Sequence, residues 1–498
     1  MDEENYLVNK EMEMMAKTFT KNKPAINITM VGFGQAGSRM ADQFAAIKNP
    51  DGTSVYNCLA LNSNDGDLAG LKHITPNNRE SLELGGLGKN PEEAMQILET
   101  NEKVKEQLKD FIKDRVRPTD DLVMFFAGLG GGTGTSTIVK AIEEFYEYNN
   151  KPKIQEEFNK LKEKYGIDEI KKEPKKYLIE ATKIARKRFT KIGVVATIPT
   201  RADGPDVLRQ VNNFTKKIDD IAKNPNKGVA FVVYPDNQLM YDEFKGLQEN
   251  ERKGIENYRD YANIKLVEEF HELNTATTGG GTSVTFDSAD FRRTILEHQG
   301  CLFISKVTKP ASDIKNGHDI KKMFSESLDK NSFHDPIELI NPETNQMAKI
   351  HHIGILAIID SKLKVGSSFI DDARDEIINK LPLNGTVFSG YIEEQNDFSV
   401  TVYTFFKAEA FPKRLAKGLV EEYNEFKQRQ KEITYMSQGI EQISETNEED
   451  DFDLSELAAE LGMEDLFEES VGEVASSADD EDIDIDDILQ QISENELK

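Results

Sequence analysis

Apolar runs that alternate with amphipathic stretches are the first regularity of this chain. The runs occupy residues 26–34, 57–62, 121–132, 191–199 and 228–235, and each ends in Gly, Asn, Asp or Pro. Amphipathic helical patterns lie between them, which indicates βα units and a parallel sheet. Ligands of such sheets collect at the carboxyl ends of the strands, so one nucleotide-sized site lined by all five strand ends is expected.

A second set of apolar runs follows at 351–360, 385–392 and 397–406, interleaved with helical segments. The pattern between the two sets predicts a long helix at about 257–274, and a last amphipathic helix is predicted at 409–434. We expect the apolar side chains of this last helix to pack on the body of the protein. They are Phe411, Leu415, Leu419, Val420, Tyr423 and Phe426.

Length and composition narrow the class of protein. At about 150 residues per domain, 498 residues suggest two to four domains. No run of 18 apolar residues occurs, so no membrane span or membrane partner is expected. The acidic N-terminus and the presence of only two cysteines favour a cytoplasmic location. A net charge of -28 argues against direct nucleic-acid binding.

The charge is unevenly distributed along the chain. Residues 445–498 hold 22 acidic residues and one basic residue, which gives them a net charge of -21. This composition predicts a disordered tail, which either folds on a partner through its Leu and Ile residues or only aids solubility. Residues 151–191 carry a net charge of +7 and read as two surface helices on either side of Pro174. This basic insert is either a solvated face or a docking surface for an acidic segment.

Two glycine motifs follow strand-like runs. Gly32 to Gly37 form a GxGxxG pattern, which is a weak signal by itself. The third run ends in the sequence GLGGGTGTS at 128–136 and opens directly onto a helical pattern. Its glycines allow backbone N–H groups to approach phosphate oxygens, and the hydroxyls of Thr133, Thr135 and Ser136 add donors at a helix N-terminus. No GxxxxGK[ST] motif follows any strand, which disfavours a P-loop.

The run at 128–136 resembles the GGGTG(T/S) signature of the tubulin/FtsZ superfamily, and further motifs extend the resemblance over residues 26–435. The resemblance implies an α/β fold in which a parallel-sheet GTPase domain is joined by a long central helix to a smaller α/β activation domain. The implied divisions are an N-terminal extension (1–25), a nucleotide-binding domain (26–255), the central helix (256–278), a loop with catalytic acids plus the activation domain (279–408), a C-terminal helix (409–436) and an acidic disordered tail (437–498).

The resemblance also implies GTP or GDP as ligand, together with Mg2+. Residues 86–91 look like a shortened form of the loop that closes over the terminal phosphate, and Asp203-Gly204 resembles a ribose-contacting Glu-Gly pair. Tyr258 is an alternative to Tyr261 as the ring that stacks on the base. The residues assigned to nucleotide binding in this way are Gly34, Gln35, Ala36, Asn62, Asp65, Gly88, Lys89, Asn90, Gly130, Gly131, Gly132, Thr133, Gly134, Thr135, Pro199, Asp203, Asn237, Tyr261 and Asn263.

Two carboxylates three residues apart, Asp287 and Asp290, follow the central helix. If they open a helix, they share one face and complement its dipole, which is a purely structural explanation. The resemblance implies instead that both are catalytic. In the family, this acidic loop enters the nucleotide site of the next subunit and positions the water that attacks the γ-phosphate. The usual Asn of this loop is replaced by Thr285.

The segments LVEEFHELN and FDSAD are similar to the plasmid TubZ branch, whereas the acidic tail favours phage tubulins. The prediction is a polymerising cytoskeletal GTPase of a bacterial host cell, which forms head-to-tail filaments and positions or segregates plasmid or phage DNA or particles. A DNA-binding adaptor or a phage component is its expected partner. The alternative is a tubulin-like replication or adaptor protein that does not need filaments. We also hypothesise that the acidic tail lies along the basic insert of a neighbouring subunit.

Overall fold

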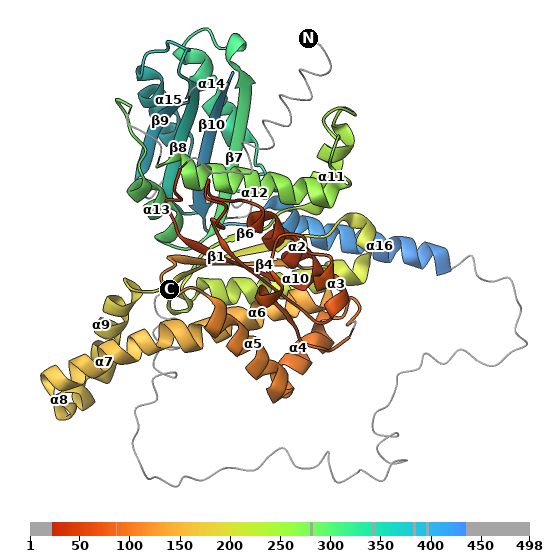
Figure 1. The fold of residues 1–498 in the computed structure, drawn as a ribbon, viewed down its shortest axis with the longest axis vertical. Helices are drawn as coiled ribbons and strands as arrows, with labels where there is room; N and C mark the ends of the chain where they lie inside the picture. Colours follow the sequence, from red (N-terminus) through yellow and green to blue (C-terminus); the bar gives the residue numbers. More distant parts are fainter. Residues whose placement is uncertain are drawn as a thin grey trace, which may run out of the picture.

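The computed structural model describes residues 22–85, 87–278, 282–340, 344–381, 385–394 and 398–434. A mixed sheet of ten strands runs through these residues in the order β3-β2-β1-β4-β5-β6-β7-β10-β8-β9. Figure 1 shows helices on both faces of the sheet and the long helix α12 (Tyr258–Ala276) between its two halves. The predicted tail at 437–498 and residues 1–21 of the predicted N-terminal extension lie outside the described residues.

The first half of the sheet consists of parallel strands. They are β1 (Ile28–Phe33), β2 (Asn57–Asn62), β3 (Arg79–Ser81), β4 (Leu122–Gly128), β5 (Lys191–Thr197) and β6 (Val229–Val233). The five apolar runs at 26–34 to 228–235 all form strands, and β3 is an additional strand of three residues without an apolar signal. From β1 the chain builds outward to β2 on one side and to β4 on the other, so the order reverses between β1 and β4. Such a switch point opens a crevice at the carboxyl ends of the two strands.

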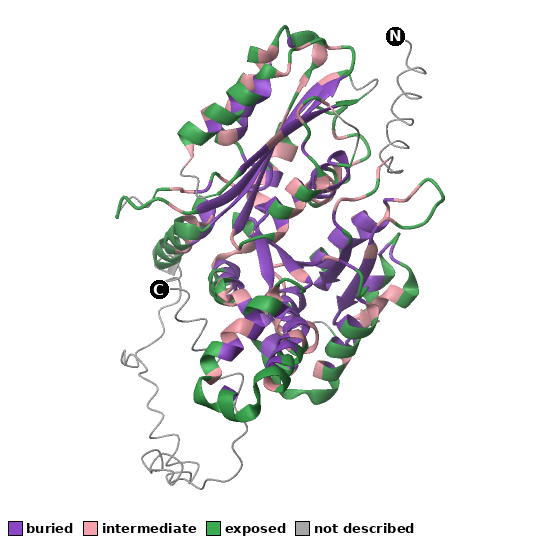
Figure 2. Cartoon of the chain, turned by 90° about the vertical axis from the view of Figure 1, so that its left-hand side faces the viewer, coloured by how far each residue is buried: buried purple, intermediate pink, exposed green. Residues whose placement is uncertain are grey.

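Strand β1 is buried along its whole length because both faces of the sheet are covered. Val31 and Phe33 face the core under α4 (Pro91–Thr100), α5 (Glu102–Arg115), α6 (Gly132–Phe145) and α10 (Pro205–Lys223). Met30 faces the core under α2 (Gly34–Ala45), α12 and α13 (Ser288–Leu296). Figure 2 shows the buried strands enclosed between helices whose outer faces are exposed.

The second half of the sheet contains β7 (Cys301–Pro310), β8 (Ile350–Asp360), β9 (Val387–Glu394) and β10 (Ser399–Ala408). Strand β10 is antiparallel to both β7 and β8, and β9 is parallel to β8. Helices α14 (Gly317–Asp329) and α15 (Ser368–Lys380) pack against each other beside these strands. A single pairing of Val232 with Cys301 makes the two halves one continuous sheet. Strand β7 has no counterpart among the predicted runs, because burial is complete only over its first five residues.

The basic insert folds into α7 (Lys151–Tyr165), α8 (Ile167–Lys172) and α9 (Pro174–Arg186). Two helices on either side of Pro174 were expected, and α8 is an additional short helix. The insert has a small core of its own, which includes Phe158 and Leu178. Helix α7 continues α6 through a π-helical turn, η2 (Tyr146–Asn150), just before Pro152. A π-turn at this place is reasonable, because proline cannot donate the hydrogen bond of a regular helix.

Several cations of the insert pair with carboxylates of the insert itself. Lys172 contacts Glu169 at 2.8 Å and Lys176 contacts Glu173 at 2.6 Å. Arg188 contacts both Glu156 and Glu157. The hypothesis that the tail binds these cations stays a prediction, and such a tail would compete with the internal pairs.

The C-terminal helix α16 (Leu419–Thr434) follows a π-helical turn, η6 (Arg414–Gly418), so regular helix begins later than residue 409. Leu415 and Leu419 are buried, as expected, but Val420 is exposed, which corrects the expectation that it packs on the body. Helix α16 packs against α10. No helix among the described residues combines the length and the apolar composition that a membrane span requires.

Candidate functional site

A cleft of about 380 Å³ lies at the switch point, at the carboxyl ends of β1 and β4. Six segments of the chain and the start of α12 form its walls. Its lining residues are Phe33, Gly34, Gln35, Ala36, Arg39, Met40, Asn62, Ser63, Asn64, Asp67, Leu87, Gly88, Lys89, Gly128, Gly130, Gly131, Gly132, Thr133, Gly134, Thr197, Pro199, Asp203, Asn237, Tyr258, Arg259 and Asn263. The cleft therefore brings together most of the residues that sequence analysis assigned to a nucleotide, and leaves out Asp65, Asn90, Thr135 and Tyr261.

The two glycine loops contact each other backbone to backbone. Gly34 has a φ of +65°, and a Cβ on it would lie 2.8 Å from the backbone nitrogen of Gly134. A Cβ on Gly134 would lie 2.9 Å from the carbonyl oxygen of Phe33. Both positions therefore require glycine. This contact places the N-terminus of α6, with its free N–H groups and positive dipole end, directly in the cleft, where an anion is stabilised.

Gly131 differs from these two glycines. It precedes α6 in an extended conformation that any residue can adopt, and a Cβ on it would meet nothing closer than 3.9 Å. Packing within the protein does not require a glycine here. Close approach of a ligand to the backbone would require one.

The hydroxyl groups of the loop 128–136 mainly form hydrogen bonds within the protein. Thr135 is fully buried and donates to the carbonyl oxygens of Gly128 at 3.1 Å and Gly131 at 2.5 Å. The assignment of Thr135 to the nucleotide stays a prediction, and in this structure its hydroxyl faces the loop's own carbonyl groups. Thr133 does line the cleft, and its hydroxyl donates to Ser63 at 2.9 Å.

A carboxylate lies beside the end of β2, but it is Asp67 rather than the expected Asp65. Asn64 caps the short helix α3 (Asp65–Ala69) by accepting a hydrogen bond from the Asp67 N–H, which turns Asp67 toward the cleft. The Asp67 carboxylate accepts hydrogen bonds from Gln35 at 3.0 Å and Asn62 at 2.8 Å. An Asn followed three residues later by an acid is a capping signal that could have identified Asp67.

Lys89 and Asp203 form an ion pair of 2.9 Å between two loops that line the cleft. Burial alone would raise the pKa of Asp203, but hydrogen bonds from Lys89 and Thr200 lower it below its usual value. Asn90, next to Lys89, caps α4 by accepting from the Glu93 N–H and lies outside the lining. Its side-chain oxygen is used by the helix, and its assignment to the ligand stays a prediction.

The start of the central helix contributes Tyr258, Arg259 and Asn263. Tyr261 instead donates its hydroxyl to Glu243 and lies outside the lining. The structure therefore favours Tyr258 over Tyr261 as the ring at the cleft. Spacing alone could not have made this choice, because Tyr258 lies five residues and Tyr261 two residues before Asn263, and neither spacing places both side chains on one helix face.

Two positively charged residues of the lining, Arg39 and Arg259, were not anticipated. Arg39 lies one turn after Gln35 on α2, and Arg259 lies one turn before Asn263 on α12. Residues four apart share a helix face, so both follow from positions that were already assigned. Their charges suit a polyanionic ligand.

Asp287 and Asp290 lie outside the cleft lining, at the start of α13. Asp287 accepts hydrogen bonds from the N–H groups of Ala289 at 2.8 Å and Asp290 at 2.9 Å, and Asp290 reciprocates as a capping box. Burial, followed by the charge of Asp287, raises the pKa of Asp290. The structural role of the pair is therefore present in the isolated chain.

A possible metal-binding group, Glu297, His298 and His352, offers ligand atoms within 4.8 Å of one another. The Thr386 N–H donates to Nδ1 of His352, so Nε2 of the neutral ring carries the proton and faces Glu297 at 3.2 Å. A ring in this tautomer has no lone pair free for a metal ion. The hydrogen bonds account for the cluster without one.

Comparison with known proteins gives the same architecture. No protein-family model matches the chain. A tubulin-like protein TubZ of Bacillus cereus is 25% identical over 340 residues, which span 64% of this chain and 65% of the relative. A GTPγS-form protofilament of TubZ from Bacillus thuringiensis serovar israelensis has a TM-score of 0.59 at 19% identity, covering 85% of this chain and 99% of that chain. A two-stranded filament model of TubZ-Bt has a TM-score of 0.61 at 18% identity, covering 88% of this chain and 97% of that chain.

The cleft at the switch point, the central helix and these matches define the class of protein by its fold, which is the tubulin-like fold. In sequence the chain is similar to TubZ. The resemblance drawn from the glycine motifs and the predicted tubulin-like α/β fold are both confirmed.

Proposed function

We propose that this protein binds GTP and GDP in the cleft, assembles head to tail into filaments and hydrolyses GTP at the contacts between subunits. One observation carries the proposal: the cleft and the acidic pair lie at opposite ends of α12. Tyr258, Arg259 and Asn263 belong to the first two turns of this helix, whereas Asp287 follows its last turn. A helix of 19 residues is ~28 Å long, so one subunit cannot bring the acids to its own cleft.

The residues of the cleft suit the parts of a guanine nucleotide. The N–H groups at the start of α6 and the Lys89 ammonium would hold the phosphates, and Tyr258 with Asn263 would receive the base. Mg2+ also fits, because Asp67 lines the cleft and its carboxylate is the kind of oxygen ligand that suits this ion. Bound there, Mg2+ would neutralise charge on the phosphates.

The catalytic step requires a second subunit. Asp287 and Asp290 would enter the cleft of the neighbour and orient or deprotonate the attacking water. The TubZ structures described above are a protofilament and a filament, and the protofilament is in a GTPγS form, which supports assembly coupled to nucleotide for this chain.

The cellular role that follows is movement or segregation of plasmid or phage DNA or particles in a bacterial cytoplasm, through a DNA-binding adaptor or a phage component. The support for this role is the similarity to TubZ, together with one solved TubZ that is described as a plasmid segregation protein.

The test separates catalysis from capping. Asp287→Asn keeps an N-cap acceptor but removes the carboxylate, so we expect stability close to parental and GTP turnover about 10²- to 10⁴-fold slower. Asn316→Ala is the matched control, because Asn316 and Asp319 form the same capping box on α14. The control should cost about 1 kcal/mol of stability and leave turnover unchanged.

Turnover per subunit, measured against protein concentration with light scattering in parallel, completes the test. We expect it to rise steeply where filaments form. Turnover that is independent of concentration, or a fully active Asp287→Asn variant, would refute hydrolysis at the subunit contact. GTP binding without any polymer would favour the adaptor or replication alternative.

A further inference from the structure

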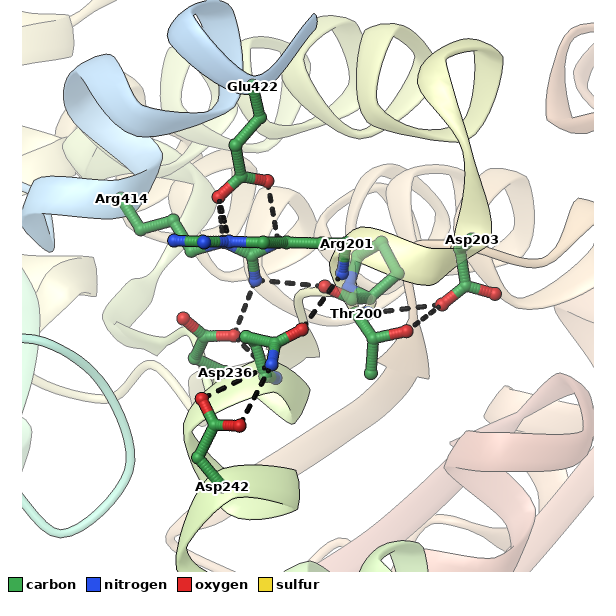
Figure 3. A network of polar contacts seen from close by, with 9 residues as sticks. Thr200, Arg201, Asp203, Asp236, Asp242, Arg414 and Glu422 are labelled. Carbon is green, nitrogen blue, oxygen red and sulfur yellow. Dashed lines mark hydrogen bonds and ion pairs between the residues drawn. The ribbon is translucent and has the colours of Figure 1, made fainter. Parts of the chain in front are cut away.

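A buried guanidinium connects the start of the C-terminal helix to the cleft. Arg414, in the turn η6, has a side chain that is only 4% exposed. Its Nη1 atom donates to the carbonyl oxygen of Pro199 at 2.9 Å and to Asp236 at 2.5 Å. Its Nε and Nη2 atoms donate to the two carboxylate oxygens of Glu422, each at 3.0 Å. Figure 3 shows the planar guanidinium between Glu422 and Asp236.

The groups that Arg414 contacts belong to the walls of the cleft. Pro199 lines the cleft and begins the loop that continues into the turn η3 (Arg201–Asp203). Asp236 caps α11 (Asn237–Gly246) and is followed by Asn237, another lining residue. The Arg414 side chain therefore holds both the loop that begins at Pro199 and the segment at Asp236 that precedes α11.

The loop is held a second time by the C-terminal helix. Arg201 donates to Glu422 at 3.0 Å, and its N–H donates to the side chain of Gln238 at 3.1 Å. Two residues further on, Asp203 accepts from the Thr200 N–H and hydroxyl and lines the cleft. Figure 3 shows these contacts as one connected network from α16 to the loop.

Such a network tolerates little displacement. A guanidinium held bidentately by one carboxylate and singly by another has a fixed orientation, and separation of any pair would leave a charge buried without its partner. The turn η6, the first turn of α16 and the loop 199–203 consequently form one rigid unit beside the cleft.

We propose that Arg414 is a positioning residue for the nucleotide, and that through it the C-terminal helix and the cleft are energetically coupled. Arg414 does not touch the ligand. It acts through Pro199 and Asp236, so whatever displaces η6 and the first turn of α16 lowers nucleotide affinity, and bound nucleotide stabilises this part of the C-terminal helix in return. This inference rests on the proposed nucleotide function of the cleft.

The experiment measures the dissociation constants of GDP and GTPγS below the concentration at which polymer forms. Arg414→Lys keeps the charge but cannot make the bidentate contact, and Glu422→Gln keeps the shape but removes the charge. We expect both variants to bind each nucleotide about 10- to 100-fold more weakly, because small displacements of positioning groups have effects of this size. The loss should appear with both GDP and GTPγS, since the network acts through Pro199, which lines the cleft, and through Asp236 beside Asn237.

Glu425→Gln is the matched control, because it makes the same chemical change at an exposed position one turn along α16. It should bind both nucleotides like the parental protein. Thermal unfolding of every variant without nucleotide shows whether the fold is intact. If Arg414→Lys is unfolded, Glu422→Gln and the exposed variant Arg201→Gln decide the question.

Hydrogen exchange gives a readout that a merely structural pair would not change. In the parental protein, GDP should slow exchange in both the 199–203 and the 414–430 segments, whereas in Glu422→Gln only the 199–203 segment should respond. The coupling would be overturned if every folded variant among Arg414→Lys, Glu422→Gln and Arg201→Gln bound nucleotide with parental affinity. It would also be overturned if GDP left hydrogen exchange in the 414–430 segment of the parental protein unchanged. A parental protein that binds no guanine nucleotide would overturn the proposed function itself and is recognised before any variant is measured.

Discussion

The cleft and the basic insert are built in opposite ways. In the cleft, main chain packs on main chain: a Cβ on Gly37 would lie 2.0 Å from the carbonyl oxygen of Phe126. In the insert, Gly166 has open space around it, and the helices are held by a small separate core and by exposed ion pairs. The region that would bind the ligand therefore depends on exact backbone positions, whereas the insert depends on composition and can change without disturbing the site.

The largest expected effect concerns two glycines of the cleft. Gly37→Ala should destabilise the protein by about 3 kcal/mol or more, because backbone must move to admit the methyl group. The free energy of unfolding of Gly131→Ala should lie within about 0.5 kcal/mol of the parental value, since no protein atom lies close to the added methyl group. We expect Gly131→Ala to bind GDP at least about tenfold more weakly, because ligand and methyl group compete for the same space.

Chemical denaturation and GDP titration of the two glycine variants check this prediction. A Gly131→Ala variant with parental affinity would show that the loop is only a turn. It would also remove the distinction between glycines needed for packing and glycines needed for the ligand.

An effect of intermediate size is expected on acidification. His334 is buried, its Nδ1 donates to the Asp335 carbonyl oxygen and its Nε2 accepts from Asn331. Burial lowers the pKa of His334 from 6.5 to about 4, so the unfolded chain binds a proton more readily than the folded protein between these values. Stability is therefore lost as pH falls from about 6.5 toward 4, by about 2 kcal/mol at pH 5 from this residue.

Urea unfolding at pH 7 and pH 5 measures this loss of stability. His334→Gln should reduce the loss of stability between the two pH values by about 2 kcal/mol, whereas the control His318→Gln, at an exposed position, should not. The insert contains no histidine, so its local hydrogen exchange should respond less than that of the body. An unchanged pH dependence in His334→Gln would contradict the assignment.

The smallest effect is expected in the insert. Arg188→Gln removes the contacts with Glu156 and Glu157, but the Arg188 side chain is 48% exposed, and ion pairs in contact with solvent contribute little to stability. GDP affinity should be unchanged. A clear loss of GDP affinity in this variant, measured by titration, would show that the insert and the cleft are not independent.

Sequence patterns predicted the parts of the molecule that are encoded locally. Strand ends and the loop 128–136 could be located because apolar runs and glycines are contiguous in sequence. Tyr261 and Thr135 lie outside the lining because the Tyr261 hydroxyl donates to Glu243 and the Thr135 hydroxyl donates to the loop's own carbonyl groups, and no local sequence pattern shows these contacts. The contacts of Arg414 could not be predicted at all, since Pro199 and Asp236 lie 215 and 178 residues away from it in the chain.

The helix that begins in the glycine loop does not end at the edge of the sheet. From Gly132 it continues through α6, η2 and α7 to Tyr165, a path of ~50 Å at 1.5 Å per residue. The insert is thus attached to the far end of a helix whose first turn faces the cleft. A tilt of about 5° at Gly132 would swing the far end by roughly 4 Å over this length. A distance probe at Tyr165 would therefore detect a small tilt of the N-terminus of α6 at the cleft, even though substitutions within the insert leave the cleft unchanged.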